Sequence, residues 1–268
     1  MGVLDSIRAF FAKLRPDELG PLEEARILEV PSGHNFRDLG GYDTPYGPTR
    51  FRRFVRSGSC SSLTHTDILR LKDYGICRVV DLRSSFEDPR TTDRFCREPG
   101  VEWLNVPLFD YDLSDPKLTG VAAPDGNYLI DGYVTMLSNR PAMRRIFEFL
   151  GETPPGGGAL FHCAAGMDRT GMVAMLLLGL AEVPRTQIVA DYLYSFATVA
   201  EVDRVVFGGR APVLREGSWN PLPSRREAVS FMLDRIEGGY GSTRAYLCAC
   251  GVDDACLDAL RGMLVGSD

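Results

Sequence analysis

The segment 162–171 constrains this 268-residue chain more than any other stretch of its sequence. It reads H-C-A-A-G-M-D-R-T-G and lies between the short apolar run 159–161 and the apolar run 172–181. The first run predicts a buried strand and the second a buried helix. A loop between a strand and a helix N-terminus presents backbone N–H groups without helical partners, at the positive end of the helix dipole. The sequence therefore predicts an anion-binding loop.

Cys163 and Arg169 are the two side chains of this loop with the clearest chemistry. A thiol at a helix N-terminus ionises more readily than a free thiol, so Cys163 is expected to be a nucleophilic thiolate. Arg169 carries a planar guanidinium fork that can bind two phosphoryl oxygens and stabilise transition-state charge. The pair therefore predicts attack of sulfur on a phosphoryl group.

The remaining loop residues fit the same chemistry. Ala164, Ala165 and Gly166 let the backbone approach a phosphoryl group closely, and the Thr170 hydroxyl could donate to the cysteine sulfur. A buried structural cysteine and a metal site built on the adjacent His-Cys pair are the alternatives. The arginine at this spacing, followed by Thr-Gly in a strand–loop–helix context, favours a catalytic cysteine over both.

The C-x5-R-T loop resembles that of the cysteine-dependent protein tyrosine phosphatase superfamily. The longer string resembles the atypical bacterial tyrosine and lipid phosphatases, whose loop reads H-C-x-A-G-K-D-R-T-G. Further blocks resemble that family in the same order, so that the likeness covers about residues 26–265; these blocks are 35–42, 56–57, 79–84, 191–195 and 240–242. One position departs from the family pattern, because Met167 stands where the family has lysine.

The resemblance implies an α/β phosphatase fold, a mixed and largely parallel sheet flanked by helices. It also implies two-step hydrolysis of phosphomonoesters through a phosphoryl-cysteine, without metal or cofactor. Asp81 would hold Arg169 in its productive rotamer, His162 would support the loop, and residues 196–222 would form a mobile cover. The expected domains are an N-terminal helical extension, 1–25, and a catalytic domain, 26–268.

The sequence contains several candidates for the general acid. Neither tryptophan precedes the Pro-Asp pair that carries the acid in better-known tyrosine phosphatases. The resemblance then makes Asp168 the first candidate, because it lies within the loop. The further candidates are aspartates on the N-terminal side of the loop: Asp112, Asp115 and Asp131.

The rest of the chain reads as alternating strands and helices. Residues 27–30, 77–82 and 103–108 predict strands, and 64–74 predicts a helix that ends at Gly75. Residues 133–150, 187–200, 225–237, 242–250 and 253–265 predict further helices. Arg37 either meets the phosphate or forms a network with Asp38, and the isolated His34 and His65 read as structural or surface residues.

Composition and charge indicate which kinds of partner and which compartment suit this protein. The net charge of −6 and the pI near 5.2 argue against a nucleic-acid partner. No apolar run approaches the 18 or so residues of a membrane span. Seven cysteines without paired spacing predict a reduced, cytoplasmic protein rather than a disulfide framework. The Met1-Gly2-x-x-x-Ser6 match to a myristoylation pattern reads as accidental.

Phosphotyrosine in proteins is the substrate that we expect first, with phosphoinositides second and inositol polyphosphates as the main alternative. Met167 lacks the lysine charge and offers apolar surface, which would favour substrates with one phosphate. A rhodanese-like sulfurtransferase and a non-catalytic phosphate-binding module are the rivals from other classes. The Arg-Thr pair and the in-loop aspartate favour phosphate chemistry over both.

Overall fold

The computed structural model describes residues 24–87, 89–109, 128–206 and 222–266. Within them a five-stranded sheet has the order β1-β2-β5-β3-β4. The strands are β1 (Arg37–Asp38), β2 (Phe54–Ser57), β3 (Ile76–Asp81), β4 (Glu102–Asn105) and β5 (Gly158–His162). Only β1 runs antiparallel to its neighbour, and the other pairings are parallel. The predicted mixed, largely parallel sheet is confirmed.

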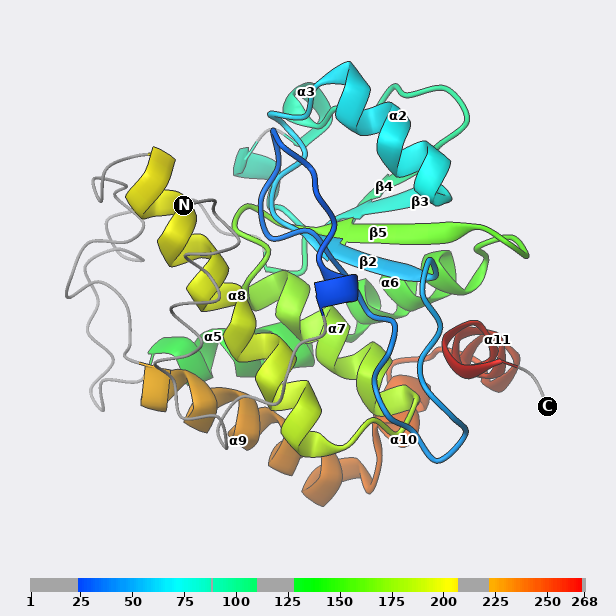
Figure 1. The fold of residues 1–268 in the computed structure, drawn as a ribbon. Helices are drawn as coiled ribbons and strands as arrows, with labels where there is room; N and C mark the ends of the chain where they lie inside the picture. The colour runs from blue at the N-terminus through cyan, green and yellow to red at the C-terminus, as the bar shows by residue number, and fades with distance from the viewer. Residues whose placement is uncertain (1–23, 88, 110–127, 207–221, 267–268) are drawn as a thin grey trace.

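Helices cover both faces of the sheet (Figure 1). On one side lie α2 (His65–Tyr74) and α3 (Pro89–Thr92). The other side holds α5 (Tyr128–Ser138), α6 (Arg140–Gly151), α7 (Asp168–Leu180), α8 (Arg185–Val206), α9 (Leu222–Tyr240), α10 (Thr243–Ala249) and α11 (Asp254–Val265). Two short 3-10 helices, η1 (Glu24–Arg26) and η2 (Ser85–Glu87), complete the described elements.

The alternation of side chains along the strands explains this two-sided cover. In β3, Val79 belongs to the core cluster under α2, whereas Val80 belongs to the larger cluster on the opposite face. Leu160 and Phe161 of β5 divide in the same way. Because successive strand residues point to opposite faces, a continuous apolar strand requires a core on each side.

Some predicted boundaries change in the structure. The predicted helix 133–150 is two helices, because the Asn139 side chain accepts from Ala142 N at 3.3 Å and caps a new helix, α6. The predicted strand 27–30 is reduced to one bridge, between Ile27 and Arg37. The helix 64–74 is confirmed, with Thr64 as its N-cap and Gly75 in the left-handed conformation at its end. Residues 1–23, which make up nearly all of the predicted N-terminal extension, and residues 110–127 and 207–221 lie outside the described residues.

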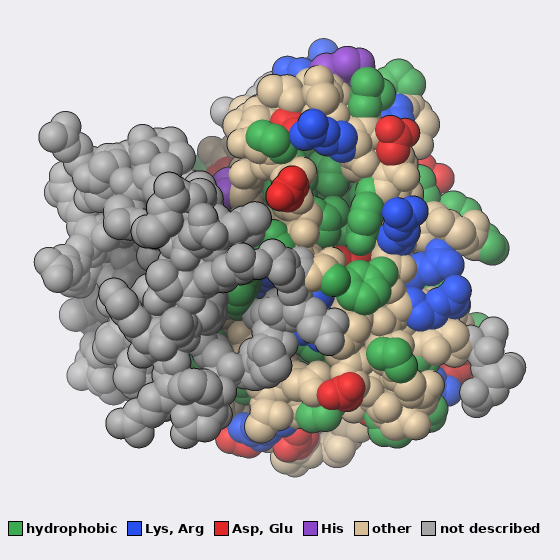
Figure 2. Space-filling view, in the orientation of Figure 1, with side chains coloured by type: hydrophobic (Ala, Val, Ile, Leu, Met, Phe, Trp, Pro, Cys, Tyr) green, Lys and Arg blue, Asp and Glu red, His purple; other side chains and the backbone are tan. Residues whose placement is uncertain are grey.

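The surface seen in Figure 2 carries basic and acidic side chains side by side across the described residues. None of the described helices combines the length and the apolar composition that crossing a membrane would require.

Helix α7 forms the centre of the larger core, since its residues from Arg169 to Leu178 are all buried. We expect Leu177→Ala, which removes a side chain with no exposed surface, to lower the free energy of unfolding by about 2–5 kcal/mol. Leu69→Ala in α2 is the matched control, since Leu69 is 43% exposed, and it should change that free energy by less than about 1 kcal/mol. Urea unfolding followed by circular dichroism measures both. Equal losses would contradict the central role of α7.

Candidate active site

The predicted anion-binding loop lies at the carboxyl edge of the sheet. Strand β5 ends at His162 and α7 begins at Asp168, so residues 163–167 form the connection. Ser57 of β2 and Asp81 of β3 are the register partners of His162, which places the ends of three parallel strands beside the loop. This is the edge at which open α/β sheets bind their ligands.

Outside donors hold the loop carbonyl groups away from its centre. The Asn35 amide donates to the carbonyl oxygens of Ala165, at 3.1 Å, and Gly166, at 2.9 Å. Arg56 Nη2 donates to the same Gly166 oxygen at 2.9 Å. Because a trans peptide directs N–H and C=O to opposite sides, carbonyl groups fixed outward leave the N–H groups facing the loop centre.

The carbonyl group of Ala164 is fixed in the same way. It accepts from the Ser59 backbone N–H at 2.8 Å, and His34 Nε2 lies 3.2 Å from it. His34 therefore belongs to the surroundings of the loop, which an isolated histidine in the sequence could not reveal. His65, by contrast, is exposed on α2, as predicted.

Gly166 is required by the backbone of the loop. Its φ is +72°, and a Cβ at this position would lie 2.5 Å from the carbonyl carbon and oxygen of Ser57. An L side chain disfavours this φ and has no space there, so the third small residue of the loop must be glycine.

A buried network behind the loop corrects the prediction for Arg37. Its side chain is 1% exposed and binds Asp191 and Ser195 of α8, as well as Asn35. Arg56 binds the same Asp191 carboxylate. The two guanidinium charges hold the pKa of Asp191 below its ordinary value, although burial acts in the opposite direction. Arg37 therefore supports Asn35 behind the loop, and it neither reaches the mouth nor pairs with Asp38.

The partner of Arg169 also differs from the one that the resemblance implied. Glu87 of η2 accepts from both terminal nitrogens of the Arg169 guanidinium, at 3.1 Å between Nη2 and Oε1. The Asp81 carboxylate is instead held by Arg83, at 2.7 Å from Nη2. Burial would raise the pKa of Glu87, but Arg169 outweighs it and lowers that pKa. Glu87 is a site residue that the sequence analysis missed, since nothing in its spacing marks it.

Asp168 faces away from the sheet, toward three helices. Its Oδ1 accepts from the Tyr133 hydroxyl of α5, from the Tyr192 hydroxyl of α8 at 3.3 Å, and from Arg225 Nη1 of α9 at 2.7 Å. The Asp168 side chain is 31% exposed, so it keeps access to solvent. Among the other acid candidates, Asp112 and Asp115 lie outside the described residues, and the side chain of Asp131 is not described either.

His162 is buried, and it belongs to the one group of metal-ligand side chains found among the described residues. Donor atoms of Cys60, Asp93 and His162 lie within 4.8 Å of one another, and His162 Nε2 is 2.8 Å from Asp93 Oδ2. Burial disfavours the imidazolium, but Cys60, Asp81 and Asp93 outweigh it and raise the pKa of His162 well above its ordinary value. The contact between His162 and Asp93 lies directly before Cys163 in the chain, and we interpret it as a buried contact that supports the loop.

The structure corrects the predicted contacts of two loop residues, Met167 and Thr170. Met167 is 1% exposed, so its side chain packs inward and does not offer apolar surface to a substrate. The Thr170 hydroxyl lies 3.5 Å from the Ser57 carbonyl oxygen, which is its acceptor in this structure in place of the cysteine sulfur. Cys163 is 3% exposed, and Ala164, the next residue of the loop, is exposed.

Comparison of this chain with known proteins identifies its family. A family model described as the tyrosine phosphatase family matches residues 28–266. A tyrosine-protein phosphatase of Nostoc commune is 33% identical over 53% of this chain and 48% of its own length, so this chain matches only about half of that relative. The triple specificity protein phosphatase PtpB of Mycobacterium tuberculosis is 29% identical over 90% of this chain and 99% of its own length. Cys163 and Arg169 bracket an anion-binding loop within the matched range, and the chain belongs to the tyrosine phosphatase family.

Proposed function

We propose that this phosphatase hydrolyses phosphomonoesters through a phosphoryl-cysteine formed on Cys163, with phosphotyrosine in proteins as its first substrate. The orientation of the loop is the observation that supports this most directly. Donors from Asn35, Arg56 and Ser59 turn the carbonyl groups of 164–166 outward. The N–H groups on the inner side can then bind the three equatorial oxygens of a phosphoryl group under attack by the sulfur.

The proposed reaction has two steps. The Cys163 thiolate attacks phosphorus and the phosphorus–oxygen bond to the leaving group breaks, while the Asp168 carboxylic acid gives its proton to that oxygen. Water then attacks the phosphoryl-cysteine, Asp168 takes back a proton, and inorganic phosphate and the thiolate are regenerated. Arg169 binds the phosphoryl oxygens in both steps.

Glu87 fixes the direction of the Arg169 guanidinium before substrate arrives. A bidentate pair uses both terminal nitrogens of the arginine and holds its plane. A guanidinium carries five N–H groups in a planar fork, which is more than one bidentate carboxylate uses, so an arginine can bind a carboxylate and a phosphoryl group together. Glu87 is therefore proposed to orient Arg169, the role that the resemblance gave to Asp81.

The proposed substrates carry one phosphate. No lysine stands at position 167, so the loop lacks a charge that would attract further phosphates. The name of the mycobacterial relative includes triple specificity, and we extend the proposal to singly phosphorylated phosphoinositides as second substrates. All seven cysteines are free, which fits a reducing compartment, and we propose the cytoplasm.

Replacement of the nucleophile tests the mechanism. We expect Cys163→Ser to abolish hydrolysis of 4-nitrophenyl phosphate, and EDTA to leave the wild-type rate unchanged, because sulfur attack requires no metal. Cys77→Ser, a half-buried thiol that donates to the Gly158 carbonyl group, is the control and should keep wild-type activity. An active Cys163→Ser protein, or a rate that EDTA removes, would contradict the proposal.

Glu87→Gln tests the orientation of Arg169. Loss of a charge-assisted contact worth about 1.5–3 kcal/mol should lower kcat/KM by about 10- to 150-fold, through misdirection of the guanidinium. The control is Glu152→Gln, which removes an exposed carboxylate paired with Arg78 at 2.9 Å and should have little effect. A rise in kcat/KM for Glu87→Gln would mean that Glu87 competes with the phosphoryl group.

Asp168→Asn tests the general acid. A poor leaving group needs a proton in the transition state and 4-nitrophenolate does not. We therefore expect the loss of kcat/KM on benzyl phosphate to exceed that on 4-nitrophenyl phosphate by about 100-fold or more. Steady-state kinetics with the two substrates measures the ratio. Equal losses on both would remove Asp168 from the role and return the search to Asp112, Asp115 and Asp131.

A further inference from the structure

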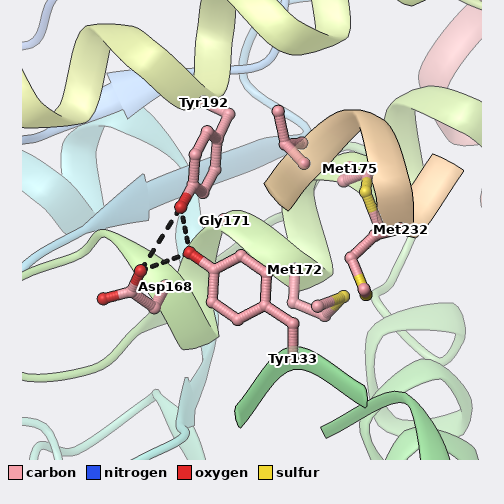
Figure 3. Close-up of a pocket in the computed structure, with 8 residues that line it drawn as sticks. Tyr133, Asp168, Gly171, Met172, Met175, Tyr192 and Met232 are labelled. Carbon is pink, nitrogen blue, oxygen red and sulfur yellow. Dashed lines mark hydrogen bonds between the residues drawn. The ribbon is translucent and has the colours of Figure 1, made fainter. Parts of the chain in front are cut away.

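Three side chains from three helices converge on a single oxygen of Asp168. Tyr133 belongs to α5, Tyr192 to α8 and Arg225 to α9, and each donates to Oδ1. The two phenol oxygens also contact each other, and the rings meet edge to face with centroids 6.1 Å apart. Figure 3 shows the tyrosine pair directed at Asp168, with the second carboxylate oxygen pointing away from them.

The three donors are buried, and their acceptor is not. Tyr133, Tyr192 and Arg225 are 3%, 2% and 4% exposed, whereas Asp168 is partly open to solvent. Gly171, one turn along α7, lets the Tyr192 ring approach, since a Cβ there would lie 2.8 Å from Tyr192 Cδ2. The glycine that follows Arg-Thr in the loop motif is thereby explained by the packing of Tyr192 against α7.

The two phenols are permanent donors. Burial raises the pKa of Tyr133 and of Tyr192, and the Asp168 charge raises both further. Neither phenol therefore loses its proton in the neutral range, and each keeps one O–H for a hydrogen bond. Arg225 adds a charged N–H to the same oxygen. A carboxylate that accepts three donors on Oδ1 has Oδ2 left to exchange a proton with another group.

We propose that Tyr133, Tyr192 and Arg225 are positioning residues, which fix Asp168 through Oδ1 so that Oδ2 faces the leaving-group oxygen of the substrate. This inference rests on the proposed acid and base role of Asp168. In the first step the proton leaves Oδ2 for the leaving group, and in the second Oδ2 receives a proton from water. The three donors keep their own protons throughout.

The network also gives a reason for helices α5, α8 and α9 to meet at the start of α7. Each contributes one donor, so a shift of any of them would turn the Asp168 carboxylate. General acid catalysis depends steeply on the direction and distance of proton transfer. Removal of a donor should therefore lower kcat/KM more on substrates with poor leaving groups than on those with good ones. Loss of a purely structural contact would lower kcat/KM equally on both.

The test compares Tyr133→Phe, Tyr192→Phe and Arg225→Gln in wild-type and in Asp168→Asn protein. In the wild-type background, each change should lower kcat/KM about tenfold more on benzyl phosphate than on 4-nitrophenyl phosphate. In the Asp168→Asn background the same changes should leave this ratio unaltered, because residues that act through one group are not additive.

Two controls separate positioning from stability. Tyr246→Phe removes another buried phenol hydrogen bond, to the Leu137 carbonyl group at 2.8 Å, and Arg226→Gln removes the adjacent positive charge of α9. Both should leave the ratio of the two substrates unchanged. The positioning proposal is overturned if the network variants lower kcat/KM equally on both substrates. It is also overturned if their effect on the ratio of the two kcat/KM values persists in the Asp168→Asn background.

The same experiment distinguishes this proposal from the proposed function. If Asp168→Asn itself leaves the ratio unchanged, Asp168 is not the acid, and the positioning proposal fails with that role. Hydrolysis by the wild-type protein and its loss in Cys163→Ser report separately on the phosphoryl-cysteine mechanism. If Asp168→Asn changes the ratio of the two kcat/KM values as expected and the network variants leave that ratio unchanged, only the positioning proposal fails.

Discussion

The site depends on the direction of a few peptide groups. An anion loop works only when its N–H groups face inward, and this requires that its carbonyl oxygens find donors elsewhere. In this protein the donors come from residues that lie more than a hundred positions earlier in the chain, such as Asn35 and Arg56. The sheet brings them together, because β2 and β5 are parallel neighbours and end side by side. The parallel pairing of these two strands is therefore a condition for the proposed phosphate binding.

The second condition is that the donors themselves are held. Arg56 and Arg37 share the Asp191 carboxylate, and all three side chains are buried. Buried charges are stable only when they are paired and hydrogen-bonded, so loss of one member leaves the others without compensation. This links α8, which carries Asp191, to the carbonyl group of Gly166 through one arginine. A shift of the helix would therefore disturb the loop.

The sequence predicts the parts of this structure that depend on neighbouring residues. The strand–loop–helix order, the anion loop and the capped helix His65–Tyr74 follow from periodicity and spacing within short windows. Glu87 could not be found in this way, because its contact with Arg169 spans 82 positions and a glutamate after Ser-Phe has no distinguishing pattern. The place of Met167 in the loop predicts apolar surface that faces the substrate, whereas the structure buries this side chain. Sequence gives the position of a side chain along the chain but not the direction in which the backbone points it.

The charges around the loop are arranged in pairs, and this decides where binding energy for a phosphoryl group arises. Arg56 faces Asp191 and Arg169 faces Glu87, so both of these cations have a carboxylate partner before substrate arrives. A paired guanidinium attracts a distant anion weakly, since its charge is largely compensated. In the proposed reaction, attraction that is specific for phosphate then comes mostly from short-range contacts, namely those of the loop N–H groups and of the Arg169 guanidinium. Such contacts strengthen only when the phosphoryl group sits correctly in the loop, which favours the transition state over loose binding of any anion.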